Sequence, residues 1–375
     1  MVDFKFVHTS DLHLGSGFGT MPEELRGRLI EARHEVLSRL VQSARDHGAQ
    51  HILVAGDTFD TTGPSAGVRR QAATKMSADS DVHWWIIPGN HDSLAAEELW
   101  RLFEEETGPN VHVLRESEPV EIAEGVWLLP SPWPRQFPGF DLTAWMTDAA
   151  TPENALRIGL AHGGITDFGD NYDASTLIPP NRAESAQLDY LALGDWHGMV
   201  DVNPRTQFSG TPERDSYRHD GRGSCHLVTI AGPGAVPSIK RQETGRFYWS
   251  AKQLNLSPNM DVVSAFQELL DPETEQRRDQ LLRIEAEGYL HMEERAALED
   301  AASKVAPDFG RFVFLDSKLA TEYQADDLDL IATGGALRVA AEELQVEAEG
   351  HGVSEQDARL AQAALNRLWS LVREG

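Results

Sequence analysis

Short apolar runs alternate with segments of helical periodicity over the first 230 residues of the chain. This alternation is typical of a layered α/β domain, because strands of a mostly parallel sheet are apolar on both faces while the covering helices are apolar on one. Strands are predicted at residues 4–9, 51–55, 83–87, 126–129, 156–161, 188–193 and 226–230. Leu25, Leu29 and Val36 recur at helical spacing after the first strand, and Gly48 is expected to end that helix.

The chain changes character at residues 231–234, Ala-Gly-Pro-Gly, which predicts a domain boundary. Strands are then expected at residues 247–256, 281–286 and 311–315, and helices at 262–270 and 293–305. That order of strands and helices indicates a small α+β domain. The predicted domains are residues 1–233, 234–325 and 326–375.

A last helix is predicted in the C-terminal segment. It opens with Ser354 and Asp357 at the spacing of a capping box. One face carries Ala361, Leu365, Leu368 and Val372. We expect this apolar stripe to pack on its own domain rather than on a partner.

Composition is that of a soluble globular protein. Hydrophobic residues make up 41% and charged residues 25% of the chain, and no apolar run approaches the ~20 residues of a transmembrane helix. The N-terminus lacks a basic region followed by an apolar stretch, so we expect a cytoplasmic protein. The single cysteine, Cys225, cannot form an internal disulfide, in agreement with a reducing compartment.

The net charge of −27 argues against a protein that binds nucleic acid by itself. Such proteins usually present a basic face that displaces counterions from phosphate, and no dense Lys/Arg cluster occurs here. A DNA substrate would need a local basic strip, a basic partner or metal ions. The alternative is that the charge only keeps the protein soluble.

Polar side chains that bind metals follow five of the predicted strands. They are Asp11 and His13, then Asp57, then Asn90 and His91, then His162, and last Asp195 and His197. The carboxyl ends of strands in an open α/β sheet converge on one crevice, so these side chains are expected to meet. Hydrolysis of a phosphate ester at neutral pH needs a deprotonated water and neutralised phosphoryl oxygens, and two divalent ions ~4 Å apart provide both.

A single Asp or His after a strand is more often a turn residue or a helix cap, but the ordered series favours a metal site. A glycine lies beside each part of the series, at Gly15, Gly56, Gly89, Gly163 and Gly194. Glycine allows sharp turns and close backbone approach at such places. Asp57 is the natural ligand to bridge two ions, and the mixed oxygen and nitrogen donors suit manganese, iron or zinc better than calcium.

Four segments resemble the successive motifs of the calcineurin-like metallophosphoesterases. They are Ser-Asp-Leu-His-Leu-Gly at 10–15, Ala-Gly-Asp-Thr-Phe-Asp at 55–60, Pro-Gly-Asn-His-Asp at 88–92, and the glycine-flanked His162. The first segment and Phe-Ser-Gly-Thr-Pro-Glu-Arg at 208–214 more narrowly resemble the SbcD/YhaO-like family of DNA repair exonucleases. The resemblance implies an α/β/β/α sandwich with a smaller C-terminal α+β capping domain and terminal helices.

The same resemblance implies a role for each motif residue. Asp11, His13, Asp57 and His197 would bind one metal ion, and Asp57, Asn90, His162 and Asp195 the other. His91 would protonate the leaving oxygen or stabilise the transition state, with Asp60 or Asp92 orienting it. The family usually ends this series with Gly-His-x-His, whereas this chain has Asp195 at the first histidine position. A carboxylate there favours manganese or magnesium.

The leading interpretation is a manganese-dependent DNA nuclease that acts in double-strand-break repair with an SbcC-like coiled-coil ATPase. By resemblance, the C-terminal helices would dock on that ATPase and the protein would form a homodimer. One alternative is a small-molecule phosphatase or cyclic-nucleotide phosphodiesterase on the same metal core. Another, supported only by Asp195, is a subunit that binds DNA ends or a partner without cutting.

Some aromatic and basic residues are candidates for substrate contacts. Trp133 and Trp196 could stack on an unpaired base, although packing is the favoured interpretation for both. Arg135, Arg214 and Arg218 are candidates for phosphate contacts because a guanidinium group matches phosphate oxygens.

Overall fold

The computed structural model describes residues 3–135, 139–165, 177–270, 274–322, 335–350 and 352–374. Contacts between residues divide the chain into two compact units, Met1–Trp249 and Ser250–Gly375. The boundary expected at residues 233–234 falls between two paired strands of the first unit, and the three-part division stays a prediction.

The first unit contains two six-stranded sheets. The first sheet has the order β12-β11-β1-β2-β3-β4 and the second the order β5-β6-β7-β8-β10-β9. The strands of the first sheet are β1 (Phe4–Thr9), β2 (His51–Ala55), β3 (His83–Ile87), β4 (Val111–Val113), β11 (Ser224–Ile230) and β12 (Ser238–Glu243). Those of the second are β5 (Val120–Ala123), β6 (Val126–Ser131), β7 (Leu156–His162), β8 (Tyr190–Gly194), β9 (Val200–Asn203) and β10 (Thr206–Phe208).

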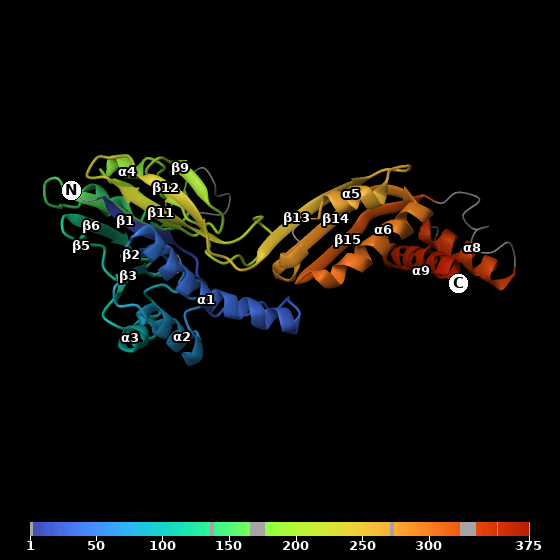
Figure 1. The fold of residues 1–375 in the computed structure, drawn as a ribbon, viewed down its shortest axis with the longest axis horizontal. Helices are drawn as coiled ribbons and strands as arrows, with labels where there is room; N and C mark the ends of the chain where they lie inside the picture. Colours follow the sequence, from blue (N-terminus) through green and yellow to red (C-terminus); the bar gives the residue numbers. More distant parts are fainter. Residues whose placement is uncertain are drawn as a thin grey trace. The chain divides into compact units, whose positions relative to one another are not determined.

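Helices cover the outer faces of the two sheets. They are α1 (Glu23–His47), α2 (Ala66–Ser77), α3 (Glu97–Glu106) and α4 (Arg182–Ser185), with a short 3-10 helix at Ala144–Thr147. Figure 1 shows α1, α2 and α3 on the side of β1 to β3 away from the second sheet, and α4 on the side of the second sheet. The layers therefore follow the order α/β/β/α, which confirms the predicted fold.

The alternation of side-chain direction along each strand accounts for these layers. In β1, Val7 packs under the helices while Phe6 enters the core between the sheets. Leu53 of β2 and Leu160 of β7 meet Phe6 in that core. Successive side chains of a strand point to opposite faces, so a strand covered on both faces is apolar at most of its positions. This requirement made β1, β2 and β3 visible in the sequence.

The second unit is a three-stranded sheet with helices. Its elements are β13 (Tyr248–Leu256), β14 (Gln280–His291), β15 (Arg311–Glu322), α5 (Val262–Glu268), α6 (Met292–Val305), α8 (Ala336–Ala348) and α9 (Glu355–Glu374), with 3-10 helices at Thr274–Asp279 and Ala306–Asp308. β14 and β15 are parallel and joined through α6. Phe266 of α5 and Leu298 of α6 lie in a core against the sheet.

The apolar stripe of α9 packs within the second unit. Leu365 is fully buried in a cluster with Met292 of α6 and Ala341 of α8, and Leu368 lies at its edge. Ala361 is buried as well. The side chain of Val372 lies outside the described residues. Across the described parts of the chain, the helices are all too short or too polar to cross a membrane.

We predict that Gly27→Ala stabilises the first unit. Gly27 is exposed inside α1, and a Cβ there would meet no atom within 4 Å. Replacing a helix-interior glycine should add about 0.5–1 kcal/mol to the free energy of unfolding and about 1–4 °C to the melting temperature.

Gly48→Ala is the matched comparison for this change. Gly48 ends α1 where predicted, at φ 71°, and donates its N–H to the carbonyl of Arg45. An alanine would carry the strain of the left-handed conformation and should lower the melting temperature. Thermal unfolding of both variants measures the difference, and shifts in the same direction would contradict this account.

Candidate metal centre

The predicted ligands lie together at the carboxyl ends of parallel strands from both sheets. Asp11 follows β1, Asp57 follows β2 and Asn90 follows β3 in the first sheet, while His162 ends β7 and Asp195 follows β8 in the second. The two sheets face each other through a shared core, so their strand ends open onto one crevice.

One group of ligands surrounds the imidazole of His13. Its Nε2 lies 3.1 Å from His197 Nε2, 3.7 Å from Asp57 Oδ2 and 4.0 Å from Asp11 Oδ1. The ligand atoms of Asp11, His13 and His197 all lie within 4.8 Å of one another. This spacing suits a single cation held by nitrogen and oxygen donors.

A second group surrounds the imidazole of His162. Its Nε2 lies 2.7 Å from Asn90 Oδ1, 3.5 Å from Asp57 Oδ2 and 3.7 Å from Asp195 Oδ1. The same oxygen of Asp57 therefore approaches a histidine of each group. Asp57 would therefore be the ligand that two ions could share.

The imidazoles present the same nitrogen to the centre of the cluster. His162 Nδ1 donates to the carbonyl of Ala55 at 2.8 Å, and His197 Nδ1 lies 2.7 Å from the carboxylate of Asp215. His13 Nδ1 faces the carboxylate of Asp60 at 3.2 Å. Because each Nδ1 carries its proton toward an acceptor, each Nε2 is left with a lone pair directed at the cluster.

These lone pairs require a positive charge between them. His13 Nε2 and His197 Nε2 are 3.1 Å apart, and His162 Nε2 is 2.7 Å from the oxygen of Asn90. Two acceptors at such a distance repel each other unless a proton or a cation lies between them. The residues present therefore fit a pair of divalent ions.

The electrostatics of the cluster support the same conclusion. Burial alone lowers the pKa of His162, but the negative charge of Asp57 outweighs burial and raises it well above the ordinary value. Burial alone raises the pKa of Asp57, but His162 and His13 outweigh it and lower it. A proton on His162 thus offsets the buried carboxylate of Asp57, and a divalent cation can take its place.

The ligand backbone is held in an uncommon conformation. The φ angles are 54° at Asp11, 43° at His13, 52° at Asp57 and 103° at Asp195, all in the region that favours glycine. The N–H groups of Asp11 and His13 donate to the carbonyls of Gly56 and Asp57. These loop-to-loop hydrogen bonds oppose the strain and fix the ligands before any ion binds.

Gly89 makes the close approach possible. A Cβ at Gly89 would lie 2.1 Å from Asp57 Oδ1 and 2.4 Å from the Asp57 nitrogen. Only a residue without a side chain allows the loop after β3 to lie against the loop after β2.

The Calcineurin-like phosphoesterase family matches residues 4–218 of this sequence. The chain belongs to that family. It is therefore a metal-dependent hydrolase, as its ligand types and their grouping indicate.

Relatives of this phosphoesterase include two bacterial proteins. It is 23% identical over 292 residues to the "Uncharacterized metallophosphoesterase YhaO" of Bacillus subtilis, a match that covers 72% of this chain and 68% of the relative. It is 34% identical over 94 residues to a subunit of the nuclease SbcCD of Escherichia coli, covering 24% of this chain and only 22% of the relative. Among solved structures, TT1561 of Thermus thermophilus aligns with a TM-score of 0.41 at 10% identity, over 64% of this chain and 99% of that one.

His91 lies at the rim of the phosphoesterase centre. Its Nδ1 donates to the backbone carbonyl of Asp60 at 2.9 Å, and its N–H donates to Asp57 Oδ1 at 2.9 Å. The carboxylate of Asp60 instead faces His13, which is the main cause of its lowered pKa. Asp60 thus orients His91 through its backbone.

Asp92 does not face His91. Its two carboxylate oxygens accept hydrogen bonds from the N–H groups of Gly89 and Phe59. Burial, followed by the charge of Asp57, raises the pKa of Asp92 to about 7. Asp92 joins the loops after β2 and β3 and so supports the position of Asp57.

Asp215 is a part of the site that no sequence pattern indicated. It accepts from His197 Nδ1 at 2.7 Å and lies 3.5 Å from Arg33 Nη2. Burial alone raises the pKa of Asp215, but His197 and Arg33 outweigh it and lower it. Arg33 also donates to the carbonyl of Leu12 at 2.7 Å, between two ligands. Asp215 therefore fixes the orientation of one proposed ligand.

The two neighbouring arginines, Arg214 and Arg218, differ in their surroundings. Arg214 is buried and donates to the carbonyl of His197 at 2.5 Å, so it supports the loop rather than offering its charge to phosphate. Arg218 is exposed and lines a cavity of about 610 Å³ beside the cluster. The other residues of this cavity are Asp195, Trp196, His197, Asp215, Ser216 and His219.

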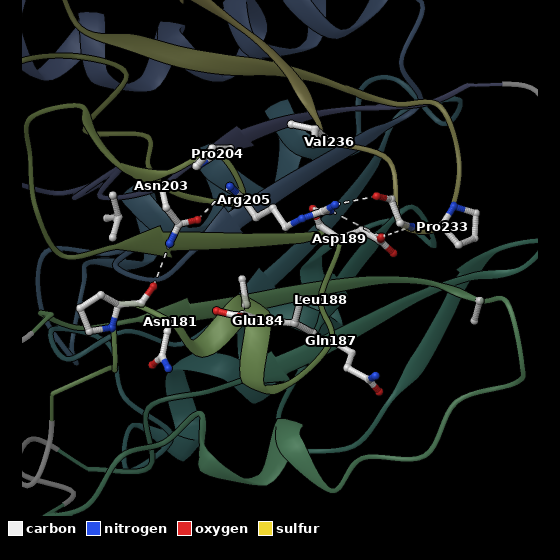
Figure 2. Close-up of a pocket in the computed structure, with 15 residues that line it drawn as sticks. Asn181, Glu184, Gln187, Leu188, Asp189, Asn203, Pro204, Arg205, Pro233 and Val236 are labelled. Carbon is white, nitrogen blue, oxygen red and sulfur yellow. Dashed lines mark hydrogen bonds and ion pairs between the residues drawn. The ribbon is translucent and has the colours of Figure 1, made fainter.

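A larger cavity of about 860 Å³ lies elsewhere, beside α4 and β8. Figure 2 shows Arg205 reaching across it toward Asp189. Arg205 donates to the carbonyls of Asp189 at 3.0 Å and Gly234 at 2.6 Å, which joins the walls to each other. None of the predicted ligands lines this cavity, so it is separate from the metal centre.

We predict that Asp215→Asn weakens metal binding about 10- to 100-fold, because His197 loses the carboxylate that orients it. Titration of the purified protein with Mn²⁺, followed by calorimetry, measures the change. Asp46→Asn on the exposed face of α1 is the control and should bind as the wild type does. Unchanged affinity in Asp215→Asn would contradict a positioning role.

Proposed function

We propose that this phosphoesterase is a manganese-dependent DNA nuclease that hydrolyses phosphodiester bonds with two metal ions. The observation that carries the proposal is the pair of ligand groups that share Asp57, with His91 at their rim. The choice of DNA as substrate is supported by the local similarity to a protein named as a nuclease subunit.

The proposed ligands follow the two groups. Asp11, His13, Asp57 and His197 hold one ion, and Asp57, Asn90, His162 and Asp195 hold the other. When bound, the ions supply a deprotonated water and neutralise charge on the phosphoryl oxygens. The carboxylate of Asp195 in place of an imidazole makes the second donor set harder, which favours manganese.

His91 is the proposed general acid. Its Nδ1 proton is committed to the carbonyl of Asp60. Nε2 is then the nitrogen that gives a proton to the leaving oxygen as the phosphorus–oxygen bond breaks. The hydrogen bond from the N–H of His91 to Asp57 places this ring next to the shared ligand.

An SbcC-like ATPase is the proposed protein partner. The α8 and α9 helices carry exposed apolar side chains, with Leu360 69% and Val339 53% exposed, while Leu365 is buried within the unit. A docking surface for a coiled coil would therefore use Leu360 and Val339 rather than the buried stripe. The homodimer and the cytoplasmic location expected from the sequence stay predictions.

Incubation of the manganese-loaded protein with linear DNA and with p-nitrophenyl phosphate and bis-ester tests the proposal. Cleavage of DNA supports it. Hydrolysis of the aryl esters without DNA cleavage would point to a small-molecule phosphatase or cyclic-nucleotide phosphodiesterase. DNA binding without hydrolysis of any substrate would point to a non-cutting subunit.

We predict that His91→Asn slows hydrolysis of DNA about 10²- to 10⁴-fold. The loss should be much smaller for bis(p-nitrophenyl) phosphate, because p-nitrophenolate leaves without protonation. The two rates, measured on the same preparation, separate acid catalysis from a structural role. Equal losses for both substrates would argue against His91 as the acid.

We predict that Asp195→Ala binds one manganese ion tightly instead of two and loses most of its activity, whereas Asp195→His keeps both. Counting bound metal by atomic emission after gel filtration, together with the rate of hydrolysis, measures this. Asp201→Ala on β9 is an exposed carboxylate control. Full manganese-dependent turnover by Asp195→Ala would exclude ligation by this residue.

A further inference from the structure

Trp196 exposes a large apolar surface beside the metal centre. Its side chain is 42% exposed, and it is the one exposed tryptophan among the described side chains. It lies between two proposed ligands, Asp195 and His197, and lines the cavity of about 610 Å³ next to them. Apolar indole surface exposed to water is unfavourable in free energy. A large exposed aromatic ring that lines a cavity therefore indicates a binding site.

The ring of Trp196 lies against His219 and the backbone of Gly198. The ring of His219 meets it edge-on with centroids 5.5 Å apart. A Cβ at Gly198 would lie 2.8 Å from Trp196 Nε1 and 2.7 Å from His219 Cε1, so both rings lie against a backbone that has no side chain there. Such support orders the indole before a ligand arrives, which lowers the entropy cost of binding.

By contrast, Trp133 is buried and packs edge-on against His162, with centroids 5.8 Å apart. That ring is part of the support of a ligand and presents little surface to a substrate. Of the two tryptophans near the centre, Trp196 is the one whose surface is open to the cavity.

We propose that Trp196 is a stacking platform for an unpaired nucleobase attached to the phosphate that is cut. The inference rests on the proposed phosphodiester hydrolysis and names its substrate class as a nucleotide with a free base face. Aromatic rings bind bases of any sequence through their π-faces. Arg218 lines the same cavity as Trp196, and its exposed guanidinium group is available to a neighbouring phosphate.

A nucleobase suits this place better than a second anion does. Asp195 and Asp215 line the same cavity and repel negative charge. A base is uncharged and flat, and the cavity has the volume of a small-ligand site. A duplex, whose bases are stacked and paired inside, cannot offer this face until its end frays.

The test compares two single-stranded oligonucleotides of equal length, one with thymine bases and one with abasic sites at every position. Both carry the same phosphates, so the ratio of their kcat/KM values with manganese isolates the contribution of the bases. We expect the wild type to favour the thymine strand on the order of 10- to 100-fold. Trp196→Ala should bring the ratio near one, and Trp196→Phe should restore most of it.

Tyr289→Ala is the control, because Tyr289 is an exposed aromatic residue of the second unit. It should leave the ratio unchanged. A wild-type ratio near one, or the same ratio in Trp196→Ala as in the wild type, would overturn the platform. This holds even if Trp196→Ala slows both substrates, since that result shows only support of the neighbouring ligands.

Failure of the nuclease proposal is distinguishable from failure of the platform. If the protein cleaves only aryl phosphates, the same variants are compared by inhibition of that reaction with AMP and with ribose 5-phosphate. AMP should inhibit at least about 10-fold more strongly in the wild type, and the two should be equal in Trp196→Ala. Equal inhibition in the wild type would overturn the platform, and success here with no DNA cleavage would assign it to free nucleotides.

Discussion

Burial of acidic groups around Asp57 is the constraint on which the rest of the site depends. Asp11, Asp57 and Asp92 are almost fully buried within three adjacent loops. Charges so placed are costly unless a partner offsets them. His162 and His13 offset Asp57, and burial, followed by the charge of Asp57, raises the pKa of Asp92. The surrounding loops hold these buried carboxyl groups in place.

That arrangement explains why the backbone is strained where the ligands lie. Left-handed φ angles at Asp11 and Asp57 turn their side chains into the crevice, and the pairing of Asp11 with the carbonyl of Gly56 opposes the strain. Gly89 allows a third loop to come within contact of Asp57. A site fixed in this way would need little rearrangement to bind cations.

The candidate ligands could be found in the sequence because they follow, or end, strands that are largely apolar. Such strands were placed within a few residues, and β1, β2 and β3 have the predicted bounds. Elements with little apolar character escaped prediction. Apart from Met76, the buried face of α2 consists of Arg69, Ala72 and Ala73, and β12 is mostly exposed at the edge of its sheet. Neither shows a hydrophobic period strong enough to detect.

Irregular loops hide the remaining parts of the site. Arg214 and Arg218 looked equivalent in the sequence, yet one is buried against the carbonyl of His197 and the other is exposed beside the cavity. Asp215 was missed because its partner, His197, belongs to a different segment and no strand pattern points to their meeting. Side-chain direction in such a loop is set by tertiary contacts, which a periodicity cannot reveal.

Several arginines form ion pairs inside the first unit, which bears on how so acidic a protein could bind a polyanion. Arg33, Arg39, Arg182 and Arg205 all pair with carboxylates of the first unit. Because these arginines already pair with carboxylates, they would neutralise few phosphates and release few counterions from DNA. If the proposed function holds, attraction for a phosphate chain would come from short range, through cations at the centre and the ring of Trp196 beside it. Contacts of that kind hold one nucleotide rather than a long duplex, and a basic partner would have to supply the rest.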